Sequence, residues 1–474
     1  MTKKVLFAAS EALPFISSGG LADVICSLPK ALNKEGLDTR IILPLYDKIP
    51  QNLRAKMTFL GSVSVPLSWR NQYCGLFEAQ TDGVTYYFLD NEYYFRRGTL
   101  YGCYDDAERF AFYCKAVLET MPLTGFYPDV LHAHDWQAAL CVLYLKLHYN
   151  QDPRYNRIKT VFTIHNIEYQ GIFGFEIMSD IFEIRPWEQK IVEWNHDINL
   201  MKGAIECCDI LSTVSPRYAE EIKGPEFAHG LDGIIRDKQY KTRGILNGID
   251  TAYYNPEKDP LIAQSFSGRT LAKKAENKMA LQNALALPLS KGPLVSMITR
   301  LTAHKGIDLV KRVIDEFLDD QEIQFVLLGT GEPEYEAFMR DLEYRRHDQA
   351  RCIIKFDKDL SKQIYAASDL FLMPSRSEPC GLSQMIASAY GAVPVVREVG
   401  GLYDSIKSYN EFTGQGNGFT FTNYNAHDML YTLRRAVQYY RQKDFWAGFV
   451  KRVMAVDFSW QASSAEYIKM YEAL

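Results

Sequence analysis

The chain has 474 residues, with 53 lysines and arginines, 58 aspartates and glutamates, and a formal net charge of −5. Its 47% hydrophobic content is too high for a disordered chain, and its length exceeds what one hydrophobic core usually fills. The slightly acidic balance argues against a nucleic acid or an anionic membrane surface, and no uninterrupted apolar run approaches the ~20 residues of a membrane helix. We therefore expect two domains, with neither nucleic acid nor membrane as a partner.

The nine cysteines are odd in number, form no C-x-x-C pair, and in several cases lie within apolar runs. Such cysteines behave as small buried hydrophobes and are typical of a reducing compartment. The N-terminal apolar stretch is interrupted at Glu11, so it predicts a buried first strand rather than a signal peptide. With no transit peptide recognised, we expect a cytoplasmic protein, in a bacterial cytosol rather than a plastid.

Short apolar runs ending in polar or turn residues recur along the chain and predict strands. A first series lies at 4–10, 40–46, 129–135, 159–166 and 209–216, and a second at 244–250, 293–300, 325–331, 352–356, 369–375 and 394–401. Near-continuous apolar strands are typical of parallel sheets covered on both faces. Helical patterns alternate with them, as at 20–36 and 304–318, so the predicted fold class is doubly wound α/β.

The two series of strands predict two Rossmann-like lobes. We place the N-terminal lobe at 1–242 and the C-terminal lobe at 243–456. The last segment, 457–474, predicts a helix that crosses back onto the first lobe. The alternating, aromatic segment 66–104 predicts hairpins inserted in the first lobe.

In open α/β sheets ligands bind beyond the carboxyl ends of the strands, so polar residues that follow the apolar runs are the candidates for a site. The first strand leads to Gly19 and Gly20, where a helix begins. Glycines allow close approach of a ligand, and the free amides of a helix start attract anions. A tight strand-to-helix turn is the alternative, because the fingerprint G-x-G-x-x-G is absent.

Histidines end two neighbouring strands of the first lobe. His132 and His134 fall on one face of the strand 129–135, which raises the question of a metal site. No further ligand cluster and no H-E-x-x-H motif accompany them, so we expect no metal, and a buried hydrogen-bonded histidine is the larger alternative. His165 ends the next strand, and the two strand ends are expected to converge.

In the second lobe Arg300 and Lys305 follow the strand 293–300. Two cations around one loop neutralise a diphosphate without a metal, although a solvated basic loop is an equal alternative. Glu378 lies between a strand and a helix, in a turn with Pro379 and Gly381. The turn holds the carboxylate for sugar hydroxyls, unless the acid merely favours the helix dipole.

Together these features predict a cleft between the lobes that binds a nucleotide-sugar. The cations and the amides at helix starts would bind the diphosphate. The histidines, Asp135 and Trp136 would bind a neutral polar substrate. Hydride transfer fits poorly, because a full dinucleotide fingerprint is missing.

The motifs SGGLADV, HAHDWQAAL, TIHNIEYQG, GILNGID, ITRLTAHKGIDL, PSRSEPCGLSQ and VGGLYDSI occur in this order along the chain. With them the sequence closely resembles bacterial glycogen synthases and plant starch synthases, over nearly its whole length. These are retaining glycosyltransferases of the GT-B type, so the resemblance implies two Rossmann-like doubly wound lobes with an active-site cleft between them. It also implies transfer of glucose from ADP-glucose to the non-reducing 4-hydroxyl of an α-1,4-glucan, such as glycogen or a maltooligosaccharide, without a cofactor. The N-terminal lobe would hold the glucan acceptor and the C-terminal lobe the donor.

The resemblance also implies roles for individual residues. Arg300 and Lys305 would hold the diphosphate, His165 and Glu378 the sugar, and Asp135 would lie close to the reacting centre. Further residues would contact the donor through backbone amides (Gly19, Gly20, Leu382 and Ser383) or side chains (Asn247 on the sugar, Phe356 against the base). Acceptor-side contacts would come from Glu11, Tyr101 and Trp136.

One position departs from the family. Its first loop normally reads K-T-G-G-L, and Ser17 stands here where the family has lysine. Serine offers a neutral hydrogen bond in place of a cation. The alternatives are a weaker affinity for the donor, UDP-glucose as the donor, or compensation by another Arg or Lys. Two rival functions follow: a GT-B transferase that uses another donor or acceptor, and a catalytically weakened glucan-binding paralogue.

Overall fold

Two units make up the structure, a computed structural model that describes residues 2–474. Unit 1 comprises the chain as far as Asn247 together with Trp460–Leu474, and unit 2 comprises Gly248–Ser459. The junctions therefore fall after Asn247 and Ser459, where the sequence suggested 242 and 456. Asn247 consequently belongs to unit 1, although the sequence assigned it to the second lobe.

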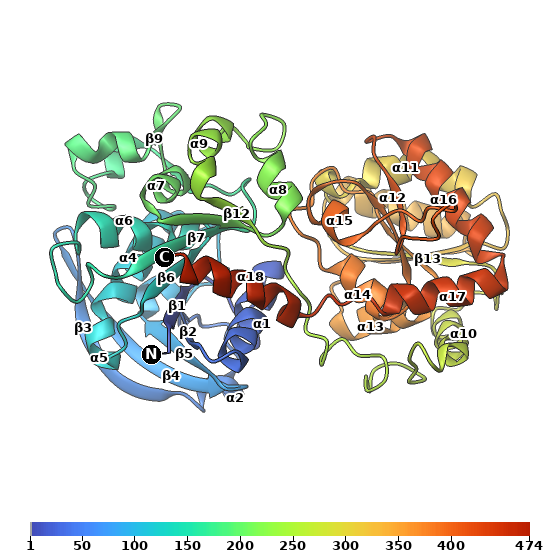
Figure 1. The fold of residues 1–474 in the computed structure, drawn as a ribbon, viewed down its shortest axis with the longest axis horizontal. Helices are drawn as coiled ribbons and strands as arrows, with labels where there is room; N and C mark the ends of the chain where they lie inside the picture. The colour runs from blue at the N-terminus through green and yellow to red at the C-terminus, as the bar shows by residue number, and fades with distance from the viewer. Residues whose placement is uncertain (1) are drawn as a thin grey trace. The chain divides into compact units, whose positions relative to one another are not determined.

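A nine-stranded sheet forms the centre of unit 1, in the order β12-β11-β7-β6-β1-β2-β5-β4-β3 (Figure 1). Seven of its strands run parallel: β1 (Lys4–Ala8), β2 (Asp38–Pro44), β5 (Val84–Asp90), β6 (Val130–His134), β7 (Lys159–Ile164), β11 (Ile210–Thr213) and β12 (Thr242–Gly244). At one edge β3 (Thr58–Leu67) and β4 (Arg70–Thr81) are antiparallel. The expected hairpins thus exist, but they begin at Thr58, and residues 92–104 form α3 (Glu92–Phe95) and a loop instead of strands.

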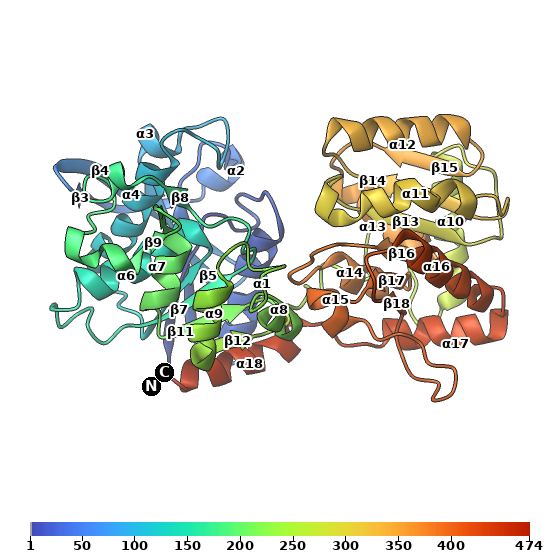
Figure 2. The ribbon, with the colours of Figure 1, turned by 90° about the horizontal axis from the view of Figure 1, so that it is seen from above.

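Helices cover the sheet of unit 1. They are α1 (Gly20–Lys34), α2 (Gln51–Arg54), α4 (Asp106–Glu119), α5 (Met121–Thr124), α6 (Ala139–Leu147), α7 (Leu200–Cys207), α8 (Pro216–Glu221), α9 (Asp232–Asp237) and α18 (Trp460–Glu472). A small antiparallel sheet of β8 (Ile172–Phe173), β10 (Asp197–Asn199) and β9 (Glu193–Trp194) lies within the same unit. The expected C-terminal helix is present as α18 (Figures 1 and 2). It packs against α1 and buries Tyr467 and Tyr471.

Unit 2 has a six-stranded, all-parallel sheet. Its order is β15 (Ala350–Ile353), β14 (Gln324–Leu328), β13 (Leu294–Ile298), β16 (Leu370–Met373), β17 (Val393–Arg397) and β18 (Phe419–Phe421). Its helices are α10 (Lys274–Ala284), α11 (Ile307–Phe317), α12 (Pro333–Arg345), α13 (Lys358–Ala367), α14 (Ser383–Ala389), α15 (Gly400–Ser405), α16 (Ala426–Tyr440) and α17 (Lys443–Met454).

Strand β14 shows why the apolar runs are continuous. Phe325 and Leu327 lie in the core that contains residues of α11 and α16, whereas Val326 and Leu328 lie in the core with residues of α10 and α13. Successive side chains of a strand point to opposite faces, so helices on both faces require apolar residues at every position. Figure 1 shows helices above and below the sheet of unit 2, which is labelled there at β13.

Two strand predictions need correction. Residues 244–250 are not a strand: β12 ends at Gly244, and an irregular segment follows, with only Ile249 bridged to Ser459. At Gly244 a Cβ atom would lie 2.5 Å from the carbonyl oxygen of Ser215, so close packing explains the glycine there. The edge strand β18 was not predicted, because three residues are too short for a recognisable apolar run.

Among residues 2–474, none of the helices combines the length and hydropathy that a membrane span needs.

Candidate active site

In unit 1, Asp135 and His165 follow the adjacent strands β6 and β7. The Asp135 amide donates to the carbonyl oxygen of Thr163 at 3.0 Å, and the His165 amide donates to Asp135 Oδ1 at 2.7 Å. Asp135 has φ of 56°, an uncommon left-handed conformation for a residue with a side chain. Burial raises the pKa of the Asp135 carboxyl to about 7, against the opposing effect of the amides of His165 and Asn166. Such a strained, buried carboxyl is characteristic of functional sites.

The imidazole of His165 lies against that of His134. His134 Nδ1 is 3.0 Å from His165 Nε2, so one of the two nitrogens donates and the other accepts. Burial lowers the pKa of His165 to about 3, and it lowers the pKa of His134 well below its ordinary value. Both rings are therefore neutral at physiological pH.

His132 is a buried, hydrogen-bonded histidine, which confirms the structural alternative for this residue. Its Nδ1 lies 2.8 Å from Tyr471 Oη of α18, and its Nε2 lies 2.5 Å from Thr163 Oγ1. Within residues 2–474 no group of three His, Cys, Asp or Glu side chains is placed to hold a metal ion.

Glu11 holds the loop that precedes α1. Its buried carboxylate accepts hydrogen bonds from the Ser18 amide and, at 3.1 Å, from Ser18 Oγ. Burial raises the pKa of Glu11, and the hydrogen bonds from Ser18, Tyr101 and the Gly19 amide oppose that rise. The loop amides predicted to bind phosphate are thus partly occupied by Glu11, whereas Ser17 is exposed.

The predicted acceptor residues Tyr101 and Trp136 lie in one aromatic cluster with Phe110. Ring centroids are 6.1 Å apart for Tyr101 and Phe110, and 5.1 Å apart for Phe110 and Trp136. Tyr101 Oη lies 2.7 Å from Ser10 Oγ. Trp136 is only 9% exposed, and a Cβ at Gly171 would come within 2.6 Å of its ring. The Trp136 indole is therefore mainly a packing residue of this cluster, in contact with Gly171 and Phe110.

Asn247, the last residue of unit 1, is buried, and its side-chain Oδ1 has no hydrogen-bond partner within residues 2–474. Unsatisfied buried oxygens are rare in proteins, and a ligand hydroxyl is one group that would satisfy this one.

In unit 2, the partly buried Lys305 and the buried Glu378 form an ion pair across two loops. Lys305 Nζ donates to Glu378 Oε1 at 2.9 Å and to Oε2 at 2.7 Å, and Ser375 Oγ donates to Oε2 at 2.9 Å. Burial acts to raise the pKa of Glu378, but Lys305, Ser375 and the nearby His304 outweigh it, so the pKa is lowered. Glu378, 7% exposed, is an anion at neutral pH.

Arg300 and Phe356 are both exposed and lie on loops after β13 and β15. The guanidinium of Arg300 forms no ion pair with any residue in the part of the chain that the structure describes. Phe356 is 81% exposed, which is unusual for a phenylalanine and leaves a ring face open to stacking.

Glycines let the loops of unit 2 approach one another. A Cβ on Gly306 would lie 2.2 Å from the carbonyl oxygen of Pro374, and one on Gly400 would lie 2.0 Å from that of Glu378. The Arg376 amide also donates to the carbonyl oxygen of His304 at 2.8 Å. The loops that carry Lys305 and Glu378 are therefore packed backbone to backbone.

Gly329 and Gly331 have a packing role of the same kind. A Cβ on either would lie within 2.2 Å of a carbonyl oxygen of the loop 299–301. Leu382 and Ser383 stand at the start of α14, where no side chain caps the helix, and Gly381 before them has φ of 71°.

Two residues with evident roles in this geometry were not predicted as site residues. Ser375 lies in the motif around Glu378 and was not predicted to contact it, although a hydroxyl three residues before a carboxylate is a local signal. His134 was weighed as a metal ligand against a buried hydrogen-bonded histidine, and its contact with His165, 31 residues away, has no local signal.

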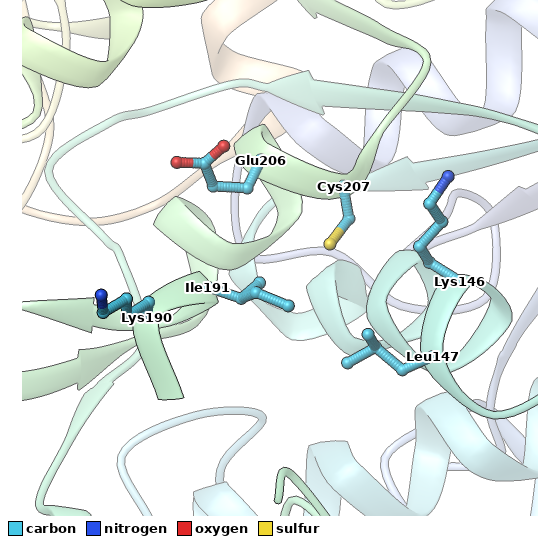
Figure 3. A pocket seen from close by; sticks show the side chains of 6 residues that line it. All are labelled: Lys146, Leu147, Lys190, Ile191, Glu206 and Cys207. Atoms are coloured by element: carbon cyan, nitrogen blue, oxygen red, sulfur yellow. The ribbon is translucent and has the colours of Figure 1, made fainter. Parts of the chain in front are cut away.

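A pocket of about 470 Å³ lies elsewhere in unit 1 and contains none of the predicted site residues (Figure 3). It is lined by Lys146, Leu147, Lys190, Ile191, Glu206 and Cys207. The candidate site is thus identified by its hydrogen bonds and charges and not by a cavity.

Comparison with known proteins bears on the identity of the site. The family model of the starch synthase catalytic domain matches residues 4–237, and that of group 1 glycosyl transferases matches residues 285–443. The glycogen synthase of Bacillus cereus (strain B4264) is 49% identical over 473 residues, which cover 99% of each chain. The glycogen synthase of Anoxybacillus flavithermus is 47% identical over 474 residues, which cover 99% of this chain and 98% of its own.

Two solved structures are similar to this chain as well. The catalytic domain of starch synthase IV from Arabidopsis thaliana, bound to ADP and acarbose, is similar with a TM-score of 0.92 at 35% identity, covering 100% of this chain and 99% of its own. Sucrose-phosphate synthase from Thermosynechococcus elongatus, at 15% identity and a TM-score of 0.62 over 99% and 98% of the two chains, shares the fold. The expectation of two Rossmann-like lobes of the GT-B type is confirmed. The chain belongs to the family of glycogen and starch synthases and is a glycosyltransferase.

Proposed function

We propose that the protein transfers glucose from ADP-glucose to the non-reducing 4-hydroxyl of an α-1,4-glucan, with retention of configuration. The relatives named glycogen synthase support the glucan substrate. The Arabidopsis relative is bound to ADP, which supports an adenine nucleotide as the donor.

The arrangement of charge on the loops after β13 and β16 carries the proposal. Arg300 is a cation without an ion-pair partner in residues 2–474, and Lys305 is held in place by Glu378. An ammonium has three N–H donors, so Lys305 retains a donor for a phosphate oxygen beside its contacts with Glu378. We assign the diphosphate to Arg300 and Lys305, and the 3- and 4-hydroxyls of the sugar to Glu378.

Backbone amides and an exposed ring complete the donor contacts. The amides of Leu382 and Ser383 at the start of α14 are assigned to the phosphates, as are those of Gly19 and Gly20 in unit 1, although Glu11 competes for the Gly19 amide. Phe356, with its exposed ring face, is assigned to the base.

In unit 1, His165 is assigned to the sugar 6-hydroxyl and, through its carbonyl oxygen, to the developing positive charge. Asn247 is assigned to a sugar hydroxyl, which its unpartnered Oδ1 supports. Asp135 is placed close to the reacting centre, and the cluster of Glu11, Tyr101 and Trp136 is assigned to the acceptor.

The reaction then needs charge stabilisation more than a general base. As the bond between the anomeric carbon and the phosphate oxygen breaks, negative charge grows on the diphosphate, and Arg300 and Lys305 stabilise it. The acceptor hydroxyl attacks from the same face, and the departing phosphate takes its proton, so configuration is retained without a protein nucleophile.

Incorporation of labelled glucose tests the proposal. Purified protein is incubated with glycogen and either labelled ADP-glucose or labelled UDP-glucose, and the product is analysed for incorporation and α-1,4 linkage. Incorporation from ADP-glucose supports the proposal, and incorporation from UDP-glucose alone contradicts the donor. No incorporation from either, with glycogen binding retained, would identify a glucan-binding paralogue.

We also place the protein in the cytoplasm. All nine cysteines are free in the structure, several of them buried, and this suits a reducing compartment.

A further inference from the structure

His134 has one ring nitrogen in a hydrogen bond and the other without a partner. Its Nδ1 contacts His165 Nε2 at 3.0 Å, whereas its Nε2 is buried and has no hydrogen-bond partner within residues 2–474. Among the three histidines at the ends of β6 and β7, this is the one fully buried nitrogen that lacks a partner in the part of the chain that the structure describes.

The orphaned nitrogen indicates where the protons are. A neutral imidazole carries one N–H, and a buried N–H without an acceptor is rarer and more costly than a buried lone pair without a donor. The proton of His134 therefore belongs on Nδ1, where it has an acceptor. His134 then donates to His165 Nε2, so the proton of His165 must be on its own Nδ1.

Packing prevents His134 from turning to another arrangement. Its ring stacks on Phe7 at a centroid distance of 5.0 Å and lies 4.1 Å from the ring of His132. His132 is in turn held by Tyr471 of α18 and by Thr163. The orientation of His134 thus depends on β1, β7 and the C-terminal helix together.

We propose that His134 is a positioning residue that fixes His165 as the Nδ1–H tautomer, so that His165 presents an N–H donor to a hydroxyl oxygen of the transferred sugar. His165 Nδ1 makes no hydrogen bond with residues 2–474, and the ring is only partly buried, so this donor remains available. The contact with the sugar hydroxyl rests on the proposed function, whereas the Nδ1–H tautomer of His165 does not. The lowered pKa values of both rings agree with two neutral imidazoles.

Nitrogen NMR of the ligand-free full chain, labelled with ¹⁵N-histidine, tests the tautomer. His165 is assigned by the loss of its signals in His165→Asn. We expect the His165 pattern of a protonated Nδ1 and an unprotonated Nε2 in the native protein. In His134→Phe, which keeps an aromatic ring but removes the donor, we expect a mixture of tautomers or the Nε2–H form. An Nε2–H form in the native protein, or an unchanged His165 in His134→Phe, overturns the proposal.

His134→Asn is the matched conservative variant, because an Asn side-chain amide can present an N–H donor close to the position of Nδ1. It should restore the native His165 tautomer and most of the activity. With glycogen and ADP-glucose, we expect His134→Phe to lower kcat by roughly tenfold or more while KM for glycogen changes little. Equal losses in both variants, with thermal unfolding unchanged, would contradict the positioning role.

The two readouts separate the two proposals. If the native protein transfers no glucose but shows the Nδ1–H form of His165, the proposed function fails and the tautomer assignment stands. If transfer is normal and the tautomer is the other one, only the inference about His134 fails.

Discussion

At the scale of single residues, the balance of charge around the proposed donor site depends on few groups. The charge of Lys305 is matched by that of Glu378, at 2.7 Å, so Arg300 supplies the net positive charge of this loop. Ser17 is exposed and neutral at the position where the sequence resemblance implies a lysine, and the nearby amide of Ser18 already donates to Glu11. The first loop of unit 1 therefore carries one cation fewer than the pattern that the sequence resemblance implies.

Replacing Ser17 by lysine should restore that cation. We expect Ser17→Lys to lower KM for ADP-glucose by a few-fold to about tenfold, because a charge-assisted contact to phosphate is stronger than a neutral one. Steady-state kinetics at two salt concentrations measure this decrease in KM, which should be smaller at the higher salt concentration because salt screens the charge. Ser17→Gln, of similar length without charge, is the control, and an unchanged KM in Ser17→Lys would show that the missing cation is compensated elsewhere.

Removing the Glu378 carboxylate should abolish most turnover. Glu378→Ala deletes the proposed sugar contact and the partner that positions Lys305, so kcat should fall by about 100-fold or more. Circular dichroism should show that the fold survives. Glu334→Ala breaks an exposed ion pair with Lys311 in the same unit and should leave kcat almost unchanged. Near-normal rates in Glu378→Ala would refute its role.

At the scale of elements, the donor side of unit 2 is a set of loops held together by glycines. Gly306 is the N-cap residue of α11, directly after Lys305, with φ of 74°, and an added Cβ atom would meet the backbone at Pro374. Gly414 has a similar φ of 68°, but an added Cβ would meet nothing within 4 Å. The two positions share a positive φ and differ in the space around them.

Alanine at these positions should separate conformational strain from close contact. Gly414→Ala should lower the free energy of unfolding by about 1 kcal/mol, the cost of a left-handed non-glycine residue. Gly306→Ala should lower it by about 1–3 kcal/mol more, because the backbone at Pro374 must move. It should also reduce kcat by displacing Lys305. Urea unfolding and kinetics measure both effects, and equal costs at the two positions would contradict the contact argument.

At the scale of the whole molecule, burial of ionisable groups in unit 1 links its stability to pH. His132, His134 and His165 have lowered pKa values in the folded state, and burial is the first cause for each. The unfolded chain takes up protons near pH 6.5, so the folded state binds fewer protons below that pH. Asp135 has the opposite sign, because its folded pKa of about 7 lies above its unfolded value of 3.8.

Unit 1 should therefore lose stability as the pH falls below about 6.5, because these three histidines and His148, whose pKa burial also lowers, bind protons mainly in the unfolded chain. Glu11 and Asp90 have raised pKa values and oppose this loss together with Asp135, but the histidines outnumber these carboxyls. The contribution of Asp135 is fully present below pH 3.8 and is lost as the pH rises through about 7. Urea unfolding between pH 4.5 and 7, followed by tryptophan fluorescence, reports mainly on unit 1, because all tryptophans except Trp446 lie there. His134→Asn should make the acid slope shallower, and an unchanged slope would contradict the assignment.

The local sequence pattern by itself determined most strands, the candidate site residues and the family of this protein. Continuous apolar runs predicted most strands of both sheets, because strands buried on both faces leave no polar position. Asp135, His165, Arg300 and Glu378 were predicted as site residues because ligands bind where such strands end, and the ordered motifs identified the family.

The tertiary structure decided which of these residues contact one another. The pairs Lys305–Glu378 and His132–Tyr471 are 73 and 339 residues apart, and the chain's course between such partners leaves no periodic signal. The orphaned nitrogen of His134 and the orphaned oxygen of Asn247 are likewise properties of packing, because burial and missing partners exist only once distant segments surround a group. Local pattern determines elements and candidate residues, whereas hydrogen-bond partners, protonation and tautomers depend on what the fold brings within 3 Å.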